Sequence, residues 1–525
     1  MKKISAQALK RLILANDEFA LIDVREQGSF SKAHLLFAVC IPLSRIEILI
    51  GDQVPRKESQ VVIIDDPAED DFGPRAVERL QELGYLDVQL LDGGVPAWRS
   101  AGFELFSGVN VPSKAFGEFV EHTYDTPRLA AEEVKALIDQ DHNMVIVDSR
   151  PFEEFNRMNI PGAIDMPGAE LAFRIHDIAP DPQTLVIVNC AGRTRSIIGA
   201  QSLINAGIPN QVVALKDGTM GWHLAGLELE HGTEREAGQP SASGIAKALT
   251  AAERVRERFR VPLVRPEQVE DWLEDTNRTT YRLDVRTPAE YVEQHLPGYR
   301  NAPGGQLVQA TDEYVAVKNA RLILADDVGV RATMTASWLI QMGWQEVYVL
   351  EGGIKSGLTI SGQTAPTVLE HLPAGTLTGE ALANNLDAVS VIDLGPSPLY
   401  EQRHIPGARW CVRARLAKAM QDLSKEMPIV LTSPDGLLAR LALAEARSLA
   451  TNEVHALEGG TDGWIAQGRS TESGLERTDC QTDDVWYKPY EHRGAQEQFM
   501  RQYLTWEVAL VEQLARDGTT RFQAF

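Results

Sequence analysis

An apolar strand that ends in aspartate recurs four times along the chain, as LIDVR, VIVDSR, YRLDVR and SVIDLG. The aspartates are Asp23, Asp148, Asp284 and Asp393, so the copies lie about one small domain apart. The chain has 525 residues, which is more than one hydrophobic core can serve, because single cores stop growing at roughly 250 to 300 residues. We therefore expect four tandem copies of one small domain.

Each copy continues with the same further signatures. A Pro-Gly segment or its equivalent leads into a short strand, as in NIPGAIDMP and HIPGARWCV. A β-rich run, a loop and an amphipathic helix follow, as in LVIVNCAGRTRSIIGAQSLINAG, and a last strand and turn close the copy, as in VVALKDGTMGW. Short apolar strands that alternate with amphipathic helices predict an α/β fold, in which each domain is a mainly parallel sheet with helices on both faces.

The repeat also sets the expected domain boundaries. The four domains are expected at residues 1–108, 125–230, 263–362 and 374–475. Residues 231–262 are expected to form a linker that ends in a helix and joins two halves, the first two domains against the last two, in a two-plus-two pseudo-symmetric arrangement. Residues 476–525 are expected to form a tail, an aromatic-rich loop and one long helix, which packs back on the domains or on a second copy of the chain in a homodimer.

Charge and hydropathy exclude several classes of function. The formal net charge is -23 at pH 7, so the surface as a whole repels phosphate backbones and anionic membranes, and neither nucleic acid nor membrane is an expected partner. No apolar run approaches the roughly 20 residues needed to span a bilayer. Four cysteines spread over the chain form no disulfide framework, so a reducing cytoplasmic location is the simplest expectation.

Only the second copy carries a thiol in the loop that follows its central strand. This loop runs from Cys190 to Ser196 as CAGRTRS and leads directly into a helix. Ligands of open α/β sheets bind at the carboxyl ends of the strands. The loop N–H groups, the helix N-terminus and the charges of Arg193 and Arg195 would favour a reactive thiolate, and Gly192 allows a tight backbone path. Cys190 is therefore the predicted nucleophile.

The corresponding loops of the other copies lack a thiol. Asp65 begins the loop of the first copy, Asp326 that of the third and Ser433 that of the fourth. We expect these three copies to serve as scaffold, interface or docking surface. Of the remaining cysteines, Cys40 and Cys411 are expected in the core. Cys480 lies in the tail, either as a half-buried thiol or as a second thiol that receives sulfur from Cys190.

Taken together, the Asp-x-Arg strand end, the HIPGA-like segment, the strand–loop–helix and the Gly-Gly/Trp ending resemble the rhodanese family closely over residues 1 to about 475. The resemblance implies a sulfurtransferase. The Cys190 thiolate would attack the outer sulfur of an anionic donor such as thiosulfate, expel sulfite and retain a persulfide, which cyanide or a thiol acceptor then removes. No cofactor is implied, and the cysteine and histidine spacings suggest no metal site.

The resemblance also implies roles for residues around Cys190. Loop N–H groups would stabilise the thiolate and the persulfide, and Arg193 or Arg195 would bind the sulfonate of the donor. The substrate-binding loop residues are Ala191, Gly192, Arg193, Thr194, Arg195 and Ser196. Asp148 and Arg150 are expected mainly as an internal ion pair behind the loop. Arg174 is a candidate to reach over the pocket, although a solvated helix face is its ordinary interpretation.

Other functions remain open at this point. The donor could be 3-mercaptopyruvate or another persulfide, although the arginine-rich loop favours an oxyanion donor. A related class of phosphatases has a longer loop than the one between Cys190 and Arg195, so phosphatase activity is disfavoured. The chain could also be a binding scaffold that relays a partner's persulfide, and turnover with small molecules alone would distinguish an enzyme from such a relay.

Overall fold

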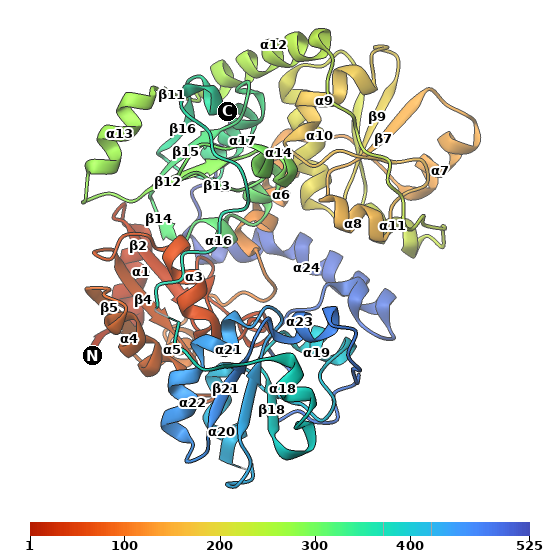
Figure 1. Ribbon diagram of the computed structural model, residues 1–525. Helices are drawn as coiled ribbons and strands as arrows, with labels where there is room; N and C mark the ends of the chain where they lie inside the picture. The colour runs from red at the N-terminus through yellow and green to blue at the C-terminus, as the bar shows by residue number, and fades with distance from the viewer. Residues whose placement is uncertain (371, 422) are drawn as a thin grey trace.

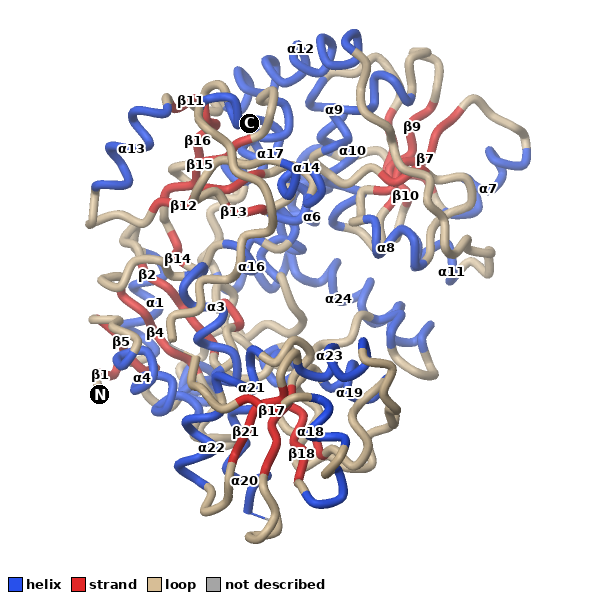
Figure 2. Tube along the Cα trace, in the orientation of Figure 1, coloured by secondary structure: helices blue, strands red, loops and turns tan. Residues whose placement is uncertain are grey.

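Four α/β units and a long C-terminal helix make up the structure (Figure 1). The computed structural model describes residues 1–370, 372–421 and 423–525. In these residues the strands form four sheets, one for each copy of the repeat, and neighbouring strands are mainly parallel (Figure 2). Helices lie on both faces, so alternate residues of one strand enter different cores, as Leu21 and Ile22 do. The expected α/β fold with four mainly parallel sheets and a helical tail is confirmed.

The first unit has a sheet that borrows a strand. Its strands are β1 (Lys2–Ile4), β5 (Asp87–Leu91), β4 (Gln60–Ile64), β2 (Phe19–Asp23) and β3 (Val39–Cys40). Its helices are α1 (Ala6–Leu14), α2 (Gln27–Phe30), η1 (Leu43–Arg45), α3 (Ile46–Gln53), α4 (Phe72–Glu82) and α5 (Gly94–Ser100), and α6 (Val111–Tyr124) leads to the second unit. Strand β14 (Val317–Lys318) of the third unit pairs antiparallel with β2. The first and third units are therefore joined through one sheet.

The second unit places its longest buried strand at the centre of the sheet. The strand order is β6 (Arg128–Leu129), β10 (Val212–Leu215), β9 (Leu185–Asn189), β7 (Met144–Asp148) and β8 (Ile164–Asp165). The helices are α7 (Ala131–Asp139), α8 (Phe152–Arg157), α9 (Glu170–Ile178), α10 (Thr194–Ala206) and α11 (Gly218–Leu224). Every residue of β9 is buried, as expected for a strand covered on both faces.

The third and fourth units repeat this strand order. The third contains β11 (Leu263–Val264), β16 (Val347–Leu350), β15 (Arg321–Ala325), β12 (Thr280–Asp284) and β13 (Arg300–Asn301), with α13 (Pro266–Glu274), α14 (Pro288–Glu293), α15 (Gly304–Gln309), α16 (Thr311–Tyr314), α17 (Val330–Gln341) and η2 (Gly353–Ser356). The fourth contains β17 (Thr376–Leu377), β21 (Val454–Leu457), β20 (Ile429–Thr432), β18 (Ser390–Asp393) and β19 (Arg409–Trp410), with α18 (Gly379–Ala383), η3 (Leu386–Ala388), α19 (Ser397–Gln402), η4 (Arg413–Arg415), α20 (Leu416–Gln421), α21 (Leu437–Leu441), α22 (Leu443–Leu449) and α23 (Gly460–Ala466).

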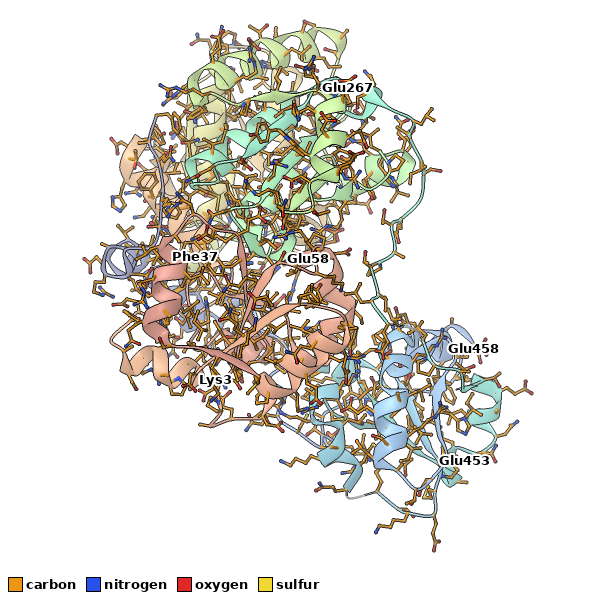
Figure 3. The ribbon with its side chains drawn as sticks, turned by 90° about the vertical axis from the view of Figure 1, so that its left-hand side faces the viewer. Lys3, Phe37, Glu58, Glu267, Glu453 and Glu458 are labelled. Atoms are coloured by element: carbon orange, nitrogen blue, oxygen red, sulfur yellow. The ribbon has the colours of Figure 1, made fainter. Side chains whose placement is uncertain are left out.

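The second unit packs on the third, and the first unit contacts both the third and the fourth. The linker ends in α12 (Ala242–Phe259), as predicted, and this helix lies against both α9 and α17, which turns the third unit onto the second. The first unit contacts the fourth through η1 and η4. Figure 3 shows Glu267 of the third unit and Glu453 of the fourth at opposite ends of the molecule. These contacts join the first two units to the last two, and the pseudo-symmetry of the two halves stays an expectation.

Close backbone contact and buried charge explain the observed pairing. A β-carbon on Gly168 of the second unit would lie 3.1 Å from Cα of Gly305 in the third, so the two loops pack with backbones touching. Arg331 of the third unit donates to Glu170 of the second over 2.9 Å. Neither contact belongs to one repeat alone, which is why the repeat pattern does not predict it.

The tail crosses the molecule beside the second unit. It contains η5 (Pro489–Glu491) and α24 (Gln496–Asp517), and α24 packs on α6 (Figure 1). The expected aromatic-rich loop and long helix are confirmed, and they pack back on the units. Among the described helices, none is both long and apolar enough to cross a membrane.

A buried carboxylate joins the first and fourth units. Glu47 accepts hydrogen bonds from Arg413 over 2.8 and 3.1 Å and from Arg79 over 2.7 Å. Burial raises the pKa of Glu47, but the two arginines outweigh this effect and hold the pKa below its ordinary value of 4.5. Its contribution to stability is therefore fully present above pH 4.5 and is lost as the pH falls further.

Replacing Glu47 with glutamine leaves the buried Arg413 with only the more distant carboxylate of Glu445, at 3.5 Å, so we expect the free energy of unfolding to fall by about 3 kcal/mol. Urea unfolding followed by circular dichroism measures this loss, and the difference from the wild type should shrink below pH 4.5. Glu78→Gln, at an exposed position of α4, is the matched control. Equal losses in the two variants would contradict the role of Glu47.

Candidate active site

Cys190 lies at the carboxyl end of the central strand β9, at the start of the loop that leads into α10. The turn after β10 contacts this loop. Thr219 donates its N–H to the carbonyl of Cys190 over 2.8 Å. Gly218 has φ +56°, and a β-carbon there would lie 2.3 Å from the same carbonyl oxygen. The glycine of the KDGTMGW segment therefore allows the close approach that fixes the position of Cys190.

The cysteine is buried, with only 2% of its surface exposed. Burial raises the pKa of the Cys190 thiol. The charge of Arg195, the hydroxyl of Ser196 and the N–H groups of Ser196 and Gly192 act in the opposite direction. The loop groups therefore favour the thiolate as predicted, but burial outweighs them and the pKa of Cys190 lies above its ordinary value.

Arg193 lines the cavity over the cysteine loop, but carboxylates occupy its guanidinium. Its Nε and Nη2 donate to the carboxylate of Glu118 over 2.7 Å each, and Nη2 also donates to Glu121 over 2.5 Å. Its Nη1 donates to Asp217 over 3.1 Å. Three carboxylates occupy the guanidinium, so Arg193 anchors the loop to α6, and the expectation that it binds a sulfonate is corrected.

Arg195 remains beside the thiol and shares a carboxylate with the tail. Its Nη2 donates to Glu154 over 2.8 Å, and Lys488 donates to the other oxygen of Glu154 over 3.0 Å. Burial raises the pKa of Glu154, but Arg195 and Lys488 hold it far below its usual range. Two cations therefore share one carboxylate, and the three groups together carry a net positive charge.

The tail closes a small cavity over the cysteine loop. The cavity has a volume of about 80 Å³. The cysteine loop forms one wall, and α6 with the residue before it and the tail form much of the rest, together with Glu154, Met220 and Gln309. The lining residues from these other walls include Asn110, Lys114, Trp486, Lys488, Tyr490, Tyr503 and Glu507. The sequence analysis missed all of the tail residues, and the aromatic run DDVWYKPY is the signal that could have indicated them.

Asp148 and Arg150 form the predicted internal ion pair. The Nε and Nη2 of Arg150 donate to the two oxygens of Asp148 over 2.8 Å each, and both side chains are buried. Asn189 also donates to Asp148 over 2.7 Å, which ties the pair to the end of β9. The first and third units contain the same kind of pair, Arg25 with Asp23 and Arg286 with Asp284, so its role is structural.

Arg174 has no place in the site. Its Nε donates to Glu170 over 2.6 Å and its Nη1 donates to the carbonyl of Gly238 over 2.7 Å. The side chain therefore holds the linker against α9, and it does not line the cavity over Cys190. The expectation that Arg174 reaches over the pocket is wrong.

In the first and third units, the N–H groups of the equivalent loop donate hydrogen bonds to a carboxylate of the same loop. In the third unit, Asp326 accepts hydrogen bonds from the N–H groups of Arg331 and Ala332 over 2.7 and 3.2 Å. In the first unit, Asp65 accepts one from the N–H of Gly73 over 3.0 Å. An internal carboxylate therefore occupies the position that Cys190 takes in the second unit.

The remaining cysteines lie away from this loop. Cys411 is buried in the core of the fourth unit, and Cys40 is half-buried beside the core of the first. Cys480 accepts a hydrogen bond from the N–H of Val412 over 3.3 Å. Cys480 of the tail is half-buried against the core of the fourth unit. This position fits a half-buried thiol, and its role as a second sulfur carrier stays a hypothesis.

Comparison with known proteins gives matches along the whole chain. The family described as rhodanese-like domain matches residues 5–101, 130–225, 265–358 and 378–467. The crystal structure of a thiosulfate sulfurtransferase from Pseudomonas aeruginosa is 47% identical, with a TM-score of 0.96, and the match covers 100% of both chains.

Two curated relatives match only a part of the chain. The HTH-type transcriptional regulator Rv0324 from Mycobacterium tuberculosis is 35% identical over 89 residues, 17% of this chain and 38% of that protein. The uncharacterized protein slr1261 from Synechocystis is 30% identical over 96 residues, 18% of this chain and 51% of that protein. The chain thus spans about half the length of these two relatives or less.

Replacing Arg195 with glutamine removes the largest influence that lowers the pKa of Cys190. We expect the pH at which Cys190 ionises to rise by about one to two pH units. The pH dependence of Cys190 alkylation by iodoacetamide, followed by peptide mass, measures this change. Arg254→Gln, at an exposed position of α12, is the control, and an unchanged profile in Arg195→Gln would show that Arg195 does not act on the thiol.

Proposed function

The chain belongs to the rhodanese-like domain family, and on that basis we propose that it is a sulfurtransferase that moves the outer sulfur of thiosulfate through a persulfide on Cys190. The carrying observation is the position of this thiol. It lies at the carboxyl end of the central strand of the second unit, where the other units have an aspartate or a serine. The likeness to the thiosulfate sulfurtransferase from Pseudomonas aeruginosa supports thiosulfate as the donor.

The first half of the reaction forms the persulfide. The Cys190 thiolate attacks the outer sulfur of thiosulfate, and a new S–S bond forms on the cysteine. The S–S bond of thiosulfate breaks, and its electron pair leaves with sulfite. The anionic persulfide then lies where the N–H groups of Gly192 and Ser196 already face the sulfur of Cys190, and these donors stabilise it as they would an oxyanion.

The donor brings negative charge into the cavity, and two cations meet it there. Arg195 and Lys488 both line the cavity and share the single carboxylate of Glu154. A sulfonate that entered would accept charge-assisted hydrogen bonds from their remaining N–H groups.

The second half of the reaction transfers the sulfur to an acceptor, which is cyanide in an assay or a thiol in the cell. The cavity of about 80 Å³ suits small molecules better than a partner's persulfide loop. This observation favours the enzyme over the relay scaffold. The alternative sulfur donors are 3-mercaptopyruvate and small persulfides. Comparing kcat/KM for each of these donors with kcat/KM for thiosulfate identifies the preferred donor.

Thiosulfate alone should load the protein with sulfur. We expect the intact mass to rise by about 32 Da after incubation with thiosulfate and removal of the donor, since one sulfur atom stays on Cys190. Cys190→Ser should show no gain, whereas Cys480→Ser should gain as the wild type does. A gain in Cys190→Ser would place the persulfide on another residue, and no gain in the wild type would exclude thiosulfate as the donor.

Lys488 should contribute to binding the donor. For Lys488→Gln we expect KM for thiosulfate to rise about 10-fold, because one charge-assisted hydrogen bond to the sulfonate is lost. Steady-state kinetics with thiosulfate and cyanide measure this change. Lys247→Gln, an exposed change on α12, is the control. An unchanged KM in Lys488→Gln would mean that the tail only covers the site.

A further inference from the structure

Glu507 of the tail helix faces the cysteine loop with one oxygen unoccupied. The side chain is buried, with 2% of the residue exposed. Its Oε1 accepts hydrogen bonds from the hydroxyls of Tyr503 over 3.1 Å and Thr194 over 3.3 Å. Its Oε2 has no hydrogen-bond partner among the described residues. A β-carbon placed on Gly192 would lie 3.3 Å from Oε2, so this oxygen borders the space next to Cys190.

The surroundings of Glu507 allow it to exchange a proton near neutral pH. The pKa of Glu507 is raised to about 7, and burial is the largest cause. The charge of Glu118 also raises this pKa, and the charges of Lys114 and Arg193 lower it. Lys114 is itself buried, which lowers its pKa to about 8. A carboxyl group with a pKa close to the working pH can both give and accept a proton efficiently.

Lys114 is the fixed counter-charge of this carboxyl. Its Nζ lies over the rings of Trp486, Tyr503 and Trp506 at 5.1, 5.4 and 5.3 Å from their centres, and it donates to the carbonyl of Val109 over 2.5 Å. The ammonium is therefore held by its surroundings and is not free to approach a substrate. Two acids among the described residues line the cavity, Glu507 and Glu154. Arg195 and Lys488 keep Glu154 ionised.

We propose that Glu507 is the acid–base residue of the half-reaction with a thiol acceptor, in which it protonates the persulfide and then takes the proton of the thiol. This proposal rests on the proposed function, because it assigns a group to the second half of that reaction. Once Cys190 is ionised, its attack on thiosulfate transfers no proton, whereas a neutral acceptor thiol must lose one before it becomes a nucleophile.

The proton balance closes over one cycle. Protonated Glu507 gives its proton to the anionic persulfide, which becomes Cys190–S–SH, and Glu507 becomes a carboxylate. The carboxylate then removes the proton of the acceptor thiol. The resulting thiolate attacks the outer sulfur, a new S–S bond forms on the acceptor, and the persulfide S–S bond breaks with its electron pair on Cys190. Cys190 is again a thiolate and Glu507 is again protonated, so no oxidant or reductant is needed.

The test compares two acceptors on the same persulfide. Protein loaded with thiosulfate is mixed either with 2-mercaptoethanol, which has a proton to lose, or with ionised sulfite, which has none and regenerates thiosulfate. We expect Glu507→Gln to lower the ratio of thiol transfer to sulfite transfer by about 10²-fold, the usual size of a general-base contribution. Glu512→Gln, an exposed change on the same helix, should leave the ratio unchanged.

The pH profile supplies a second measurement that does not depend on the folding of a variant. In the wild type, transfer to the thiol should fall as the pH rises through about 7, because Glu507 then loses the proton that it gives to the persulfide, whichever thiol is used. In Glu507→Gln the profile should follow the ionisation of the free thiol and shift when a more acidic thiol replaces 2-mercaptoethanol.

Several outcomes would overturn the proposal. An unchanged ratio in Glu507→Gln, or a wild-type profile that follows the free thiol, would remove Glu507 from the proton transfer. An equal loss with both acceptors would assign it a structural role. A wild type that takes no sulfur from thiosulfate would instead contradict the proposed function, and loading with another persulfide donor would still allow the two acceptors to be compared.

Discussion

The site depends on Glu154, a buried carboxylate that binds Arg195 of the cysteine loop and Lys488 of the tail at the same time. Arg195 would be costly to bury without a counter-charge, and the carboxylate between the two cations stays ionised. The same contact orders the loop and holds the tail against it. The charge cluster therefore joins two walls of the cavity over Cys190.

The N–H groups of the loop after the central strand face different groups in the second and third units. In the third unit the carboxylate of Asp326 accepts the loop N–H groups, so the cradle holds an anion that is part of the chain. In the second unit the position belongs to Cys190, and the N–H groups of Gly192 and Ser196 face sulfur. The residue at the end of the central strand thus decides whether the loop N–H groups bind a carboxylate of the chain or face a thiol.

The repeat, the α/β fold and the position of Cys190 could be predicted from the sequence, because they depend on local patterns that return in each copy. The ion pair of Asp148 and Arg150 could be predicted for the same reason. The partners of Arg193 could not, since Glu118 and Glu121 lie on α6, outside the repeat. Closure by the tail was also missed, because it depends on contacts between residues more than three hundred positions apart, such as Thr194 with Glu507.

The order of the segments has a consequence for synthesis on the ribosome. The second unit can fold as soon as its own residues emerge, since domains generally fold as units from the N-terminal side during translation. Lys488, Tyr503 and Glu507 are translated after all four units. Until then Cys190 lies in an open loop, accessible to cellular oxidants and electrophiles. Translation of the tail therefore ends a period of chemical vulnerability as well as completing the pocket.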